Sequence, residues 1–318
     1  MTSKKKEHPL VSICIPLYNA SEYIEETLNK IFEQTYENIE VVVVDDHSTD
    51  GSYEILKTFE SDKIKLYKNP KNGGNAARNY AFQQSKGDYI KFMDADDYCS
   101  ENMIKAQLER LLNEGNENTL IFSPLRLLHP DGSFWHPPRL IDKDFSPGIE
   151  LLIAIWKRKG FHCPHCHLMH RYLVEKSGGW DEKIIKNQDG EFFARISAIA
   201  DKSLSVPSEY AVWRRTMKGV SNQTKLDSID SVIDTLDITS KLLFNYDDSL
   251  EMKRICGKYI GFYVYQEYPN IKPLLPKIEL LAKTNDIEIN LPERKILKLL
   301  TLCFGWKTAL KLNHKFKL

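Results

Sequence analysis

The stretch Asp88-Tyr-Ile-Lys-Phe-Met-Asp-Ala-Asp-Asp-Tyr98 joins a short apolar run to a cluster of acids. Residues 89–92 have the β-branched and aromatic composition of a buried strand. Asp94, Asp96 and Asp97 follow directly, and open parallel sheets bind their ligands beyond the carboxyl ends of the strands. A tight turn would aim Asp94 and Asp96 at one hard cation, for which Mg²⁺ or Mn²⁺ is suited. The alternative is that Asp96 or Asp97 caps the next helix.

Strand and helix signals alternate on the amino-terminal side of this stretch. An apolar run that stops at Pro16 predicts the first strand, and acids at the start of the next segment suit the first turn of a helix. The alternation predicts an α/β protein with a doubly wound, mainly parallel, Rossmann-like sheet. The expected strands are 10–15, 39–44, 64–67 and 89–92, and the expected helices begin at 21, 52 and 75, with a further one near 100.

The second half of the chain has weaker strand signals and ends in a helical region. We expect helices at 149–158, 168–177 and 191–200, strands at 203–206 and 209–214, and a loop at 216–223. From residue 228 onward the pattern is helical throughout. The expected organisation is a catalytic domain at 1–225, with halves at about 9–115 and 116–225, and a helical appendage at 226–318.

Charge is distributed unevenly in a chain that is neutral overall. The 318 residues contain 44 Lys and Arg and 44 Asp and Glu, yet residues 294–318 hold seven basic residues and no acidic one. This tail is also amphipathic, with Phe304 and Trp306 on its apolar side. Such a segment favours an anionic membrane surface as partner. The alternative is that its apolar side packs on the preceding helices.

Cysteine usage and the amino-terminal sequence indicate the compartment. The six cysteines are scattered, which is no disulfide framework and favours a reducing environment. Residues 1–9 lack the apolar run of a signal peptide, and no apolar stretch approaches the roughly 18 residues of a spanning helix. We expect a cytoplasmic protein that can attach peripherally to the inner face of a membrane.

Five motifs stand in order along the chain: Val11-Ser-Ile-Cys-Ile-Pro-Leu-Tyr-Asn19, Asp45-Asp-His-Ser-Thr-Asp-Gly51, Asp94-Ala-Asp96, Gly178-Gly-Trp-Asp-Glu182 and Asn187-Gln-Asp-Gly-Glu191. With these motifs the chain resembles the inverting family 2 glycosyltransferases of GT-A fold over about residues 9–222. The family implies a nucleotide-sugar donor, here expected to be UDP-linked, a divalent cation (Mn²⁺ or Mg²⁺) and a glycan or lipid-linked sugar acceptor, with no nucleic acid.

The resemblance assigns residues to the donor side. Tyr18 would stack on the base, Asp46 would contact the base or ribose, and Arg78 would pair with base or phosphate oxygens. The alternatives are that Asp45 or Asp46 caps the following helix and that Arg78 is an exposed helix arginine. The implied nucleotide-binding residues are Pro16, Tyr18, Asp46, Arg78, Asp94 and Ala95, and the implied metal ligands are Asp94 and Asp96.

The resemblance also assigns the reaction. Inversion needs one base to take the acceptor's proton, and by resemblance Asp189 is that base, with Glu191 in reserve. Trp180 and Asp181 would wall the acceptor pocket. The alternative for Asp189 is a helix N-cap. A mobile loop carrying Arg214, Arg215 and Lys218 would close over the diphosphate, and the alternative there is a solvated basic loop.

Two further kinds of site, for haem and for zinc, are suggested by the run Cys163-Pro-His-Cys166-His167. Its spacing satisfies the signature for covalent haem attachment, and with His162 and His170 it resembles a zinc site. A haem site requires an exported, oxidising setting, and a zinc site usually needs a second ligand pair. The run from Cys166 to Arg171 is also similar to a segment of some family members, so we interpret it as a buried strand and turn.

We therefore expect an inverting, metal-dependent hexosyltransferase-like enzyme that builds a surface polysaccharide or glycan. A sugar-nucleotidyltransferase is one rival, but it would need a glycine-rich loop where Pro16-Leu-Tyr-Asn-Ala20 stands. A catalytically inactive nucleotide-sugar-binding protein is the other, and the presence of all expected carboxylates argues against it.

Overall fold

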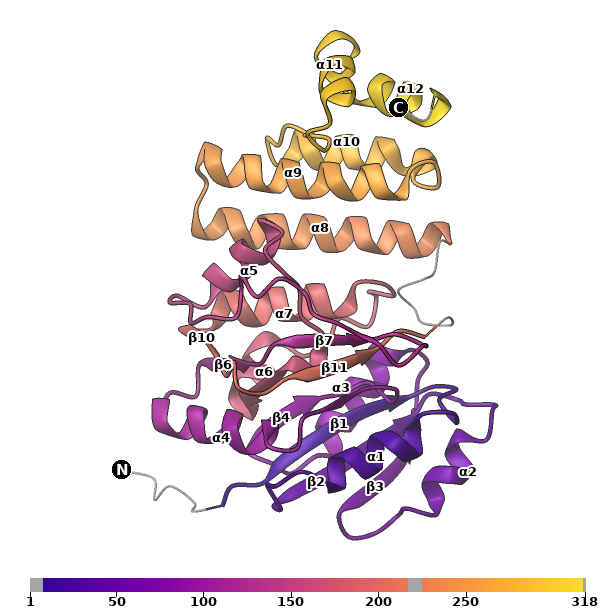
Figure 1. The fold of residues 1–318 in the computed structure, drawn as a ribbon, viewed down its shortest axis with the longest axis vertical. Helices are drawn as coiled ribbons and strands as arrows, with labels where there is room; N and C mark the ends of the chain where they lie inside the picture. Colours follow the sequence, from indigo (N-terminus) through magenta and orange to yellow (C-terminus); the bar gives the residue numbers. More distant parts are fainter. Residues whose placement is uncertain (1–7, 217–224, 317–318) are drawn as a thin grey trace.

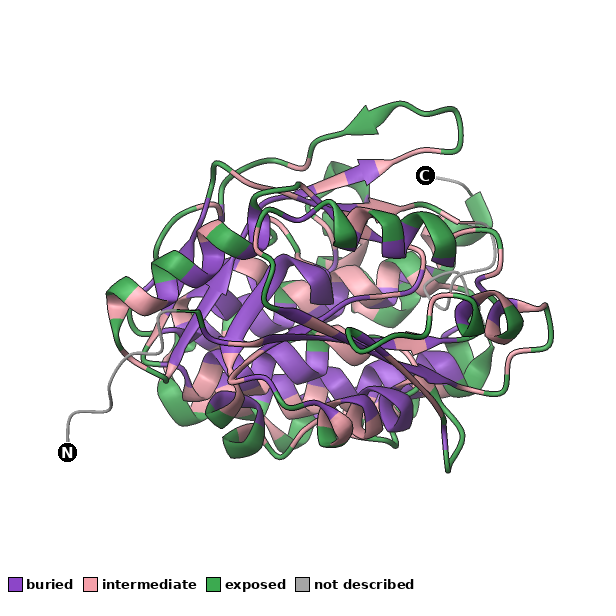
Figure 2. Ribbon diagram, turned by 90° about the horizontal axis from the view of Figure 1, so that it is seen from below, coloured by how far each residue is buried: buried purple, intermediate pink, exposed green. Residues whose placement is uncertain are grey.

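The centre of the protein is a seven-stranded sheet in the order β10-β6-β9-β4-β1-β2-β3 (Figure 1). This computed structural model describes residues 8–216 and 225–316. Four strand pairs are parallel, and the strands are largely buried (Figure 2). The predicted doubly wound, mainly parallel sheet is confirmed. Its strands are β1 (Val11–Leu17), β2 (Ile39–Asp45), β3 (Ile64–Lys68), β4 (Tyr89–Phe92), β6 (Thr119–Phe122), β9 (His167–His170) and β10 (Lys202–Ser205).

The sequence predicted a first strand that stops at Pro16, and the structure corrects this end point. Strand β1 continues to Leu17, with Pro16 in register with Val44 of β2. The ladder between β1 and β4 ends earlier, at Cys14 and Phe92. Proline is tolerated where no neighbouring strand needs its missing N–H, and Pro16 lies beyond the reach of β4.

Strand β9 corrects the predicted helix at 168–177. It runs antiparallel to both β4 and β6, and only Arg171–Ser177 forms a helix, α6. The apolar pair Leu168 and Met169 is buried, and a short buried run cannot be assigned to helix or strand by periodicity. The interpretation of the segment from Cys166 as a buried strand and turn is confirmed.

The helices of residues 8–216 begin within about three residues of their predicted positions, and α7 begins at Gln188 rather than at 191. Helix α1 starts at Ile24 rather than at 21, and α4 starts at Met103 with Asn102 before it. Asp96 and Asp97 therefore do not cap α4, and that alternative is wrong. The helices are α1 (Ile24–Phe32), α2 (Ser52–Lys57), α3 (Gly74–Gln84), α4 (Met103–Glu114), α5 (Ile149–Trp156), α6 and α7 (Gln188–Ile199).

A second, four-stranded sheet in the order β5-β11-β7-β8 was not predicted. Strand β5 directly follows the acid cluster and pairs antiparallel with β11. The second sheet therefore attaches the segment that ends in Arg214 to the carboxyl end of β4. Its strands are β5 (Tyr98–Cys99), β7 (Leu125–Leu128), β8 (Phe134–Trp135) and β11 (Ala211–Arg214).

The predicted helical region follows, and it shares a hydrophobic core with the catalytic half. Buried side chains of α5 and Ala194 of α7 belong to the same cluster as those of the carboxyl-terminal helices. Helices α5 and α7 lie between the main sheet and α8 (Figure 1). The helices are α8 (Leu226–Tyr246), α9 (Leu250–Glu267), α10 (Leu275–Thr284), α11 (Lys295–Phe304) and α12 (Trp306–Phe316).

The basic tail forms two short helices at the end of the molecule farthest from β3 (Figure 1). Leu297 and Leu310 are buried, whereas Leu299, Leu302 and Phe304 are exposed. One side of the tail thus packs on the core, and another presents apolar side chains to solvent. Within residues 8–216 and 225–316, no helix combines the length and apolarity needed to cross a bilayer.

Candidate active site

The acids after β4 form a turn, closed by a hydrogen bond of 3.2 Å from the Asp97 N–H to the Asp94 carbonyl. Asp97 is buried, and its Oδ1 accepts the backbone N–H of Arg214 at 2.8 Å. Its Oδ2 lies 3.3 Å from Nδ1 of His165. Asp97 therefore ties the turn to β11, and it leaves Asp94 and Asp96, both partly exposed, as the acids available to a ligand.

Asp96 has a perturbed acidity. Burial, and next the charge of Asp94, raise the pKa of Asp96 to about 6. Two carboxylates that repel each other at the carboxyl end of a strand suit a divalent cation, which would offset both charges. Among the described residues, no group of three or more His, Cys, Asp or Glu could hold a metal ion. The pair fits a cation that draws its other ligands from water and a diphosphate.

The loops after β1 and β2 are bonded together, which shapes the predicted nucleotide side. Asp50 accepts the N–H of Ser21 at 2.9 Å, that of Ser52 at 3.0 Å, and the Ser52 hydroxyl. Burial raises the pKa of Asp50, but these hydrogen bonds, that of the Ser52 hydroxyl first, lower it to about 2. Tyr18 next to this contact is 64% exposed, so its ring is free to stack on a base. Asp50 was not among the predicted residues, although its motif was.

Asp45 is the last residue of β2, and Asp46 follows it directly. Both carboxylate oxygens of Asp46 accept the Gly73 N–H, at 2.9 and 3.0 Å. Asp45 accepts the N–H of Ser48 at 3.2 Å. Neither bond caps α2, since Gly51 precedes that helix, so the capping alternative is wrong. A carboxylate has about four acceptor positions, so Asp46 retains capacity for a ribose hydroxyl or a base N–H.

Arg78 of α3 is not an exposed helix arginine, because its side chain is 10% exposed and joins three elements. Its Nη2 donates to Asp94 at 2.7 Å, and its Nη1 donates to Gln188 at 2.9 Å. Its guanidinium carbon lies 4.7 Å from the centre of the Trp180 ring. Sequence reasoning missed Gln188, although it stands in the same motif as Asp189.

The turn before α7 is docked on α3. Asn79 accepts the Trp180 N–H at 2.8 Å and donates to its carbonyl at 2.9 Å, and Asn75 donates to the Asp181 carbonyl at 2.7 Å. Trp180 is 3% exposed and its ring stacks on Phe192 at 4.1 Å. The prediction that Trp180 walls an open acceptor pocket is therefore corrected: its ring supports Arg78 from the core.

Asp189 lies in the first turn of α7, next to the acid turn. Asn187 precedes the helix with a positive φ of 61°, so Asp189 is not its N-cap residue. A Cβ at Gly190 would come within 2.3 Å of the Asn187 side chain, which requires glycine there. Burial raises the pKa of Asp189, and the charge of Asp94 raises it further. The two predicted site acids are thus close enough to interact electrostatically.

Glu191 and Asp181, the other two acids predicted near Asp189, each form contacts with another residue. Glu191 is 2% exposed and forms a two-bond ion pair with Arg195, at 2.5 and 2.8 Å. The Glu191 carboxylate is thus occupied by this ion pair, and its place as the reserve base stays a prediction. Asp181 accepts the Lys183 N–H at 2.9 Å and remains partly exposed on the acceptor side.

Arg214 lies against the acid turn. Its Nε donates to the Asp96 carbonyl at 3.0 Å, and its Nη2 forms an ion pair with Glu26 at 2.8 Å. Arg215 is exposed and its N–H donates to Leu128 at 2.9 Å. Lys218, the third predicted residue of the diphosphate loop, lies outside the described residues.

The cysteine-histidine run is part of the core. Residues Pro164–Cys166 form one 3-10 turn before β9, and both Cys163 and Cys166 are buried and unbridged. Burial raises the pKa of Cys163 well above its ordinary value and that of Cys166 to about 12. Among residues 8–216 and 225–316 no three His, Cys, Asp or Glu side chains are placed to hold a metal ion, which argues against the zinc alternative.

The model of glycosyl transferase family 2 matches residues 12–178, which include the acid turn and most of the donor side. The chain belongs to this family. It is 37% identical over 211 residues to an uncharacterized glycosyltransferase of Rickettsia bellii, covering 64% of this chain and 30% of that protein. It is 36% identical over 129 residues to glycosyltransferase GlyG of Streptococcus pneumoniae, covering 40% and 42%. The chain therefore spans well under two thirds of the length of either relative.

The fold matches that of a solved structure over nearly the whole chain. The crystal structure of S. aureus TarS 1-349 in complex with UDP-GlcNAc superposes with a TM-score of 0.69 at 17% identity, covering 97% of this chain and 91% of TarS 1-349. The match includes the carboxyl-terminal helices, since almost no part of the chain lies outside it. The predicted GT-A fold with a helical appendage is confirmed.

Proposed function

We propose that the protein transfers a sugar from a nucleoside diphosphate sugar, UDP-linked, to an acceptor hydroxyl with inversion at the anomeric carbon. The contact of Arg78 with both Asp94 and Gln188 carries this proposal. Arg78 holds the acid turn and the start of α7 next to each other. A donor bound at the acid turn and the base Asp189 would therefore face the same site. Family membership and the TarS complex with UDP-GlcNAc support the donor class.

The reaction needs one base. Asp189 takes the proton of the acceptor hydroxyl as that oxygen bonds to the anomeric carbon, and the bond to the departing diphosphate breaks on the opposite face. A raised pKa suits this role, because a stronger base accepts the proton more readily near neutral pH. Neither a covalent intermediate nor a second base is required.

A divalent cation, Mg²⁺ or Mn²⁺, completes the donor side. Asp94 and Asp96 would hold it, and when bound it supplies charge stabilisation to the diphosphate leaving group. The raised pKa of Asp96 supports this assignment, since two adjacent acids without a cation repel each other. Arg214, bonded to the Asp96 carbonyl, and the exposed Arg215 would add positive charge near the diphosphate.

The product and its location follow from the same evidence. A putative teichuronic acid biosynthesis glycosyltransferase, TuaG of Bacillus subtilis, is 34% identical over 143 residues and supports a bacterial surface glycan as the product. The exposed apolar side chains of α11, together with seven basic residues and no acid over 294–318, support peripheral attachment to an anionic membrane. A lipid-linked sugar acceptor would then meet the enzyme at that surface.

The substitution Asp189→Asn tests the function. It keeps the shape of the side chain but removes the base, so we expect transfer to fall by about 10² to 10⁴ while UDP binding and melting temperature stay near wild type. UDP release from UDP-glucose, UDP-galactose and UDP-N-acetylglucosamine, with and without acceptor, is the assay. Asp131→Asn is the matched control and should retain transfer, because Asp131 is exposed in the turn between β7 and β8 and an amide oxygen would still accept the Ser133 N–H.

Two results would contradict this proposal. Near-wild-type transfer by Asp189→Asn would remove the assigned mechanism and direct attention to Asp181. Tight UDP-sugar binding by the wild type without hydrolysis or transfer of any donor would instead favour the inactive nucleotide-sugar-binding alternative.

A further inference from the structure

A cavity of about 170 Å³ lies where the catalytic half meets the carboxyl-terminal helices. Its walls come from α5, α7 and β9 on one side and from α8 and α9 on the other. Asp189 is one of the lining residues, so the cavity adjoins the proposed base. Asn187 at its edge is exposed and donates to Thr235 of α8 at 2.7 Å, which joins the two sides.

Two aromatic stacks form much of the wall. Trp156 and Tyr259 stack with ring centres 4.5 Å apart and 14° between planes. Phe193 and His167 stack at 3.9 Å and 21°. Burial, and next the charge of Asp189, raise the pKa of Tyr259, which places its hydroxyl in the electrostatic field of the base. Flat apolar surfaces of this kind bind the faces of planar or cyclic ligands.

Three ring nitrogens behind this wall lack partners, but protein atoms enclose them and keep them from the cavity surface. Among the described residues, neither ring nitrogen of His162 nor Nδ1 of His167 has a hydrogen-bond partner, although His167 is 2% exposed. Burial lowers the pKa of His162 to about 3 and that of His167 well below its ordinary value, so both are neutral. Each neutral ring offers a donor and an acceptor, and buried polar atoms of this kind normally have partners.

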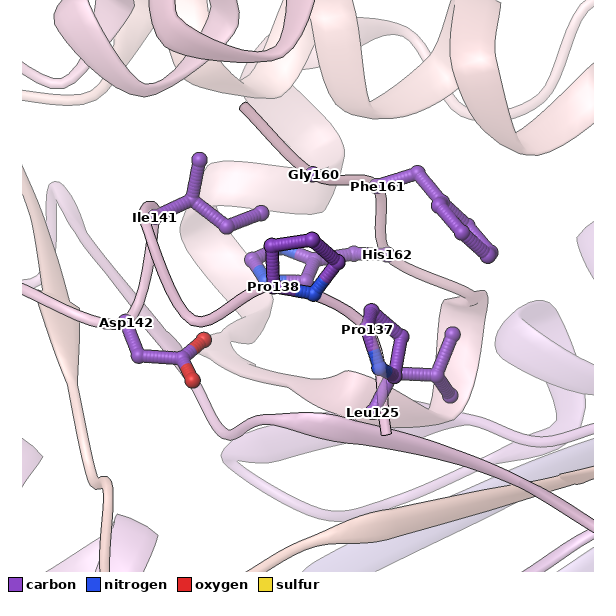
Figure 3. Close-up of a pocket in the computed structure, with 8 residues that line it drawn as sticks. All are labelled: Leu125, Pro137, Pro138, Ile141, Asp142, Gly160, Phe161 and His162. Carbon is purple, nitrogen blue, oxygen red and sulfur yellow. The ribbon is translucent and has the colours of Figure 1, made fainter. Parts of the chain in front are cut away.

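The small pocket on another side of His162 is not an alternative site. It is formed with Pro137, Pro138 and Ile141 (Figure 3), and it has a volume of about 10 Å³. A space of that size holds about one water molecule. Only the larger cavity has room for a ligand, and it is the one that Asp189 lines.

The charge of the lining restricts the ligand further. The described residues around the cavity include Asp189 but no lysine and no arginine. A phosphate or carboxylate there would face a carboxylate and two neutral imidazoles without a cation to balance it. Burial of an unpaired charge is costly, so an anionic group is excluded.

We propose that this cavity receives an uncharged, hydroxyl-bearing ring of the acceptor, so that α8 and α9 help to select the substrate. This inference rests on the proposed function, in which Asp189 takes the acceptor's proton. A neutral sugar ring fits the lining: its apolar faces lie against the aromatic side chains, and its hydroxyls have Asp189 and Thr239 as partners. Thr239 and Tyr259 are then specificity residues contributed by the carboxyl-terminal helices.

Phenyl glycosides test the ligand class by calorimetric titration of the full chain in the presence of UDP. The phenyl β-glycosides of glucose, galactose, mannose and N-acetylglucosamine are compared with phenyl β-glucuronide, which adds a carboxylate. We expect at least one neutral glycoside to bind, and the glucuronide to bind at least about 10-fold more weakly than phenyl glucoside. The absence of binding by every neutral glycoside, or equal binding of the glucuronide, would overturn the proposal.

Thr239→Phe tests the place of binding, because Thr239 is 3% exposed and lines the cavity from α8. The larger side chain should abolish binding of the neutral glycoside. Asn245→Phe adds the same side chain at an exposed position of α8 and should leave binding unchanged. If Thr239→Phe does not fold, Ala194→Val fills the cavity from α7 and should weaken binding.

The same titrations separate the two proposals. Unaltered glycoside binding by a folded, cavity-filled variant overturns the cavity assignment, whatever the donor does. Failure of the wild type to bind UDP or to release it from any UDP-sugar overturns the proposed function instead. Glycoside binding without UDP binding would show that the cavity binds sugars, but it would overturn the proposal that this sugar is the acceptor of a UDP-sugar transferase.

Discussion

Arg78 donates to Gln188 at 2.9 Å, so a residue of α3 fixes the first turn of α7. The same guanidinium holds Asp94 at 2.7 Å through its other terminal nitrogen. The position of Asp189 relative to the acid turn is therefore set by one side chain rather than by two independent loops. Arginine suits this place because its planar group presents several donors in a fixed geometry.

Arg78→Lys should lower sugar transfer by about 10²-fold, because one ammonium cannot hold Asp94 and Gln188 in the same arrangement and small displacements of reacting groups are costly. Stability should fall by about 1–3 kcal/mol through the lost charged hydrogen bonds. Steady-state kinetics and chemical denaturation measure the two effects. Arg110→Lys, at an exposed ion pair with Asp144, is the control and should change neither. A fully active Arg78→Lys variant would contradict the role.

Asp96→Asn should remove most of the Mn²⁺-dependent gain in UDP affinity while the fold is retained. The reason is that Asp96, whose pKa burial and Asp94 raise to about 6, supplies one of two carboxylates to the cation. UDP titrations with Mn²⁺ and with a chelator measure the effect. Asp50→Asn, in the loop after β2, is the control and should keep its metal dependence. Wild-type UDP affinity that is the same with and without metal would contradict the assignment.

Replacing both Leu299 and Leu302 with glutamine should weaken binding to anionic vesicles by at least about 10-fold, because each inserted leucine contributes roughly 1.5–3 kcal/mol. Both side chains are exposed on α11, at 62% and 77%. Co-sedimentation with phosphatidylglycerol vesicles over a range of salt concentrations is the measurement. Removing 294–318 altogether would also delete buried Leu297, so point changes are the sharper test.

The control for the tail is Leu280→Gln, at a 64% exposed position of α10 outside the basic segment. It should leave vesicle binding unchanged. If the wild-type protein ignores anionic vesicles at low salt, or if the double variant binds them as well as wild type does, membrane attachment through α11 is wrong.

Acid should destabilise the protein partly through His162. Burial lowers the pKa of His162 to about 3, below the value of about 6.5 in an unfolded chain, so the unfolded state binds more protons between these values. This histidine's contribution is therefore fully favourable above pH 6.5 and is lost as the pH falls toward 3. Between pH 7 and pH 5 the loss is on the order of 2 kcal/mol.

Chemical denaturation of His162→Gln at pH 7 and pH 5 checks that linkage. The difference between the two free energies of unfolding should shrink by about 2 kcal/mol relative to wild type. His136→Gln, at an exposed position, should leave the difference unchanged. An identical pH dependence in His162→Gln and wild type would show that His162 titrates normally in the folded protein.

The sequence was most informative where the local pattern and the tertiary role agree. Strand β4 and the acids after it were predicted correctly, because a buried strand followed by clustered carboxylates has few other interpretations. Strand β9 was partly assigned to a helix because both states bury a short apolar run. The second sheet was missed because its strands are two to four residues long and are defined by partners far away in the chain.

The site was predictable as a set of motifs but not as a set of contacts. The sequence identified Arg78 and Asp189, yet nothing local reveals that Gln188 joins them. Trp180 and Glu191 were assigned to the acceptor side, but each has a partner in the core that sequence spacing does not reveal. The cavity beside Asp189 is formed by helices of both regions, so no single segment encodes it.

The antiparallel placement of β9 has a consequence for synthesis on the ribosome. Tyr89 and Ile90 of β4 pair on one side with β1, which emerges earlier, and on the other with His170 and Met169, which emerge much later. Until β9 has left the exit tunnel, β4 is an open strand edge, and such edges pair readily with other chains. The donor half therefore cannot close its sheet during translation before the acceptor half begins to appear, so the two halves mature together.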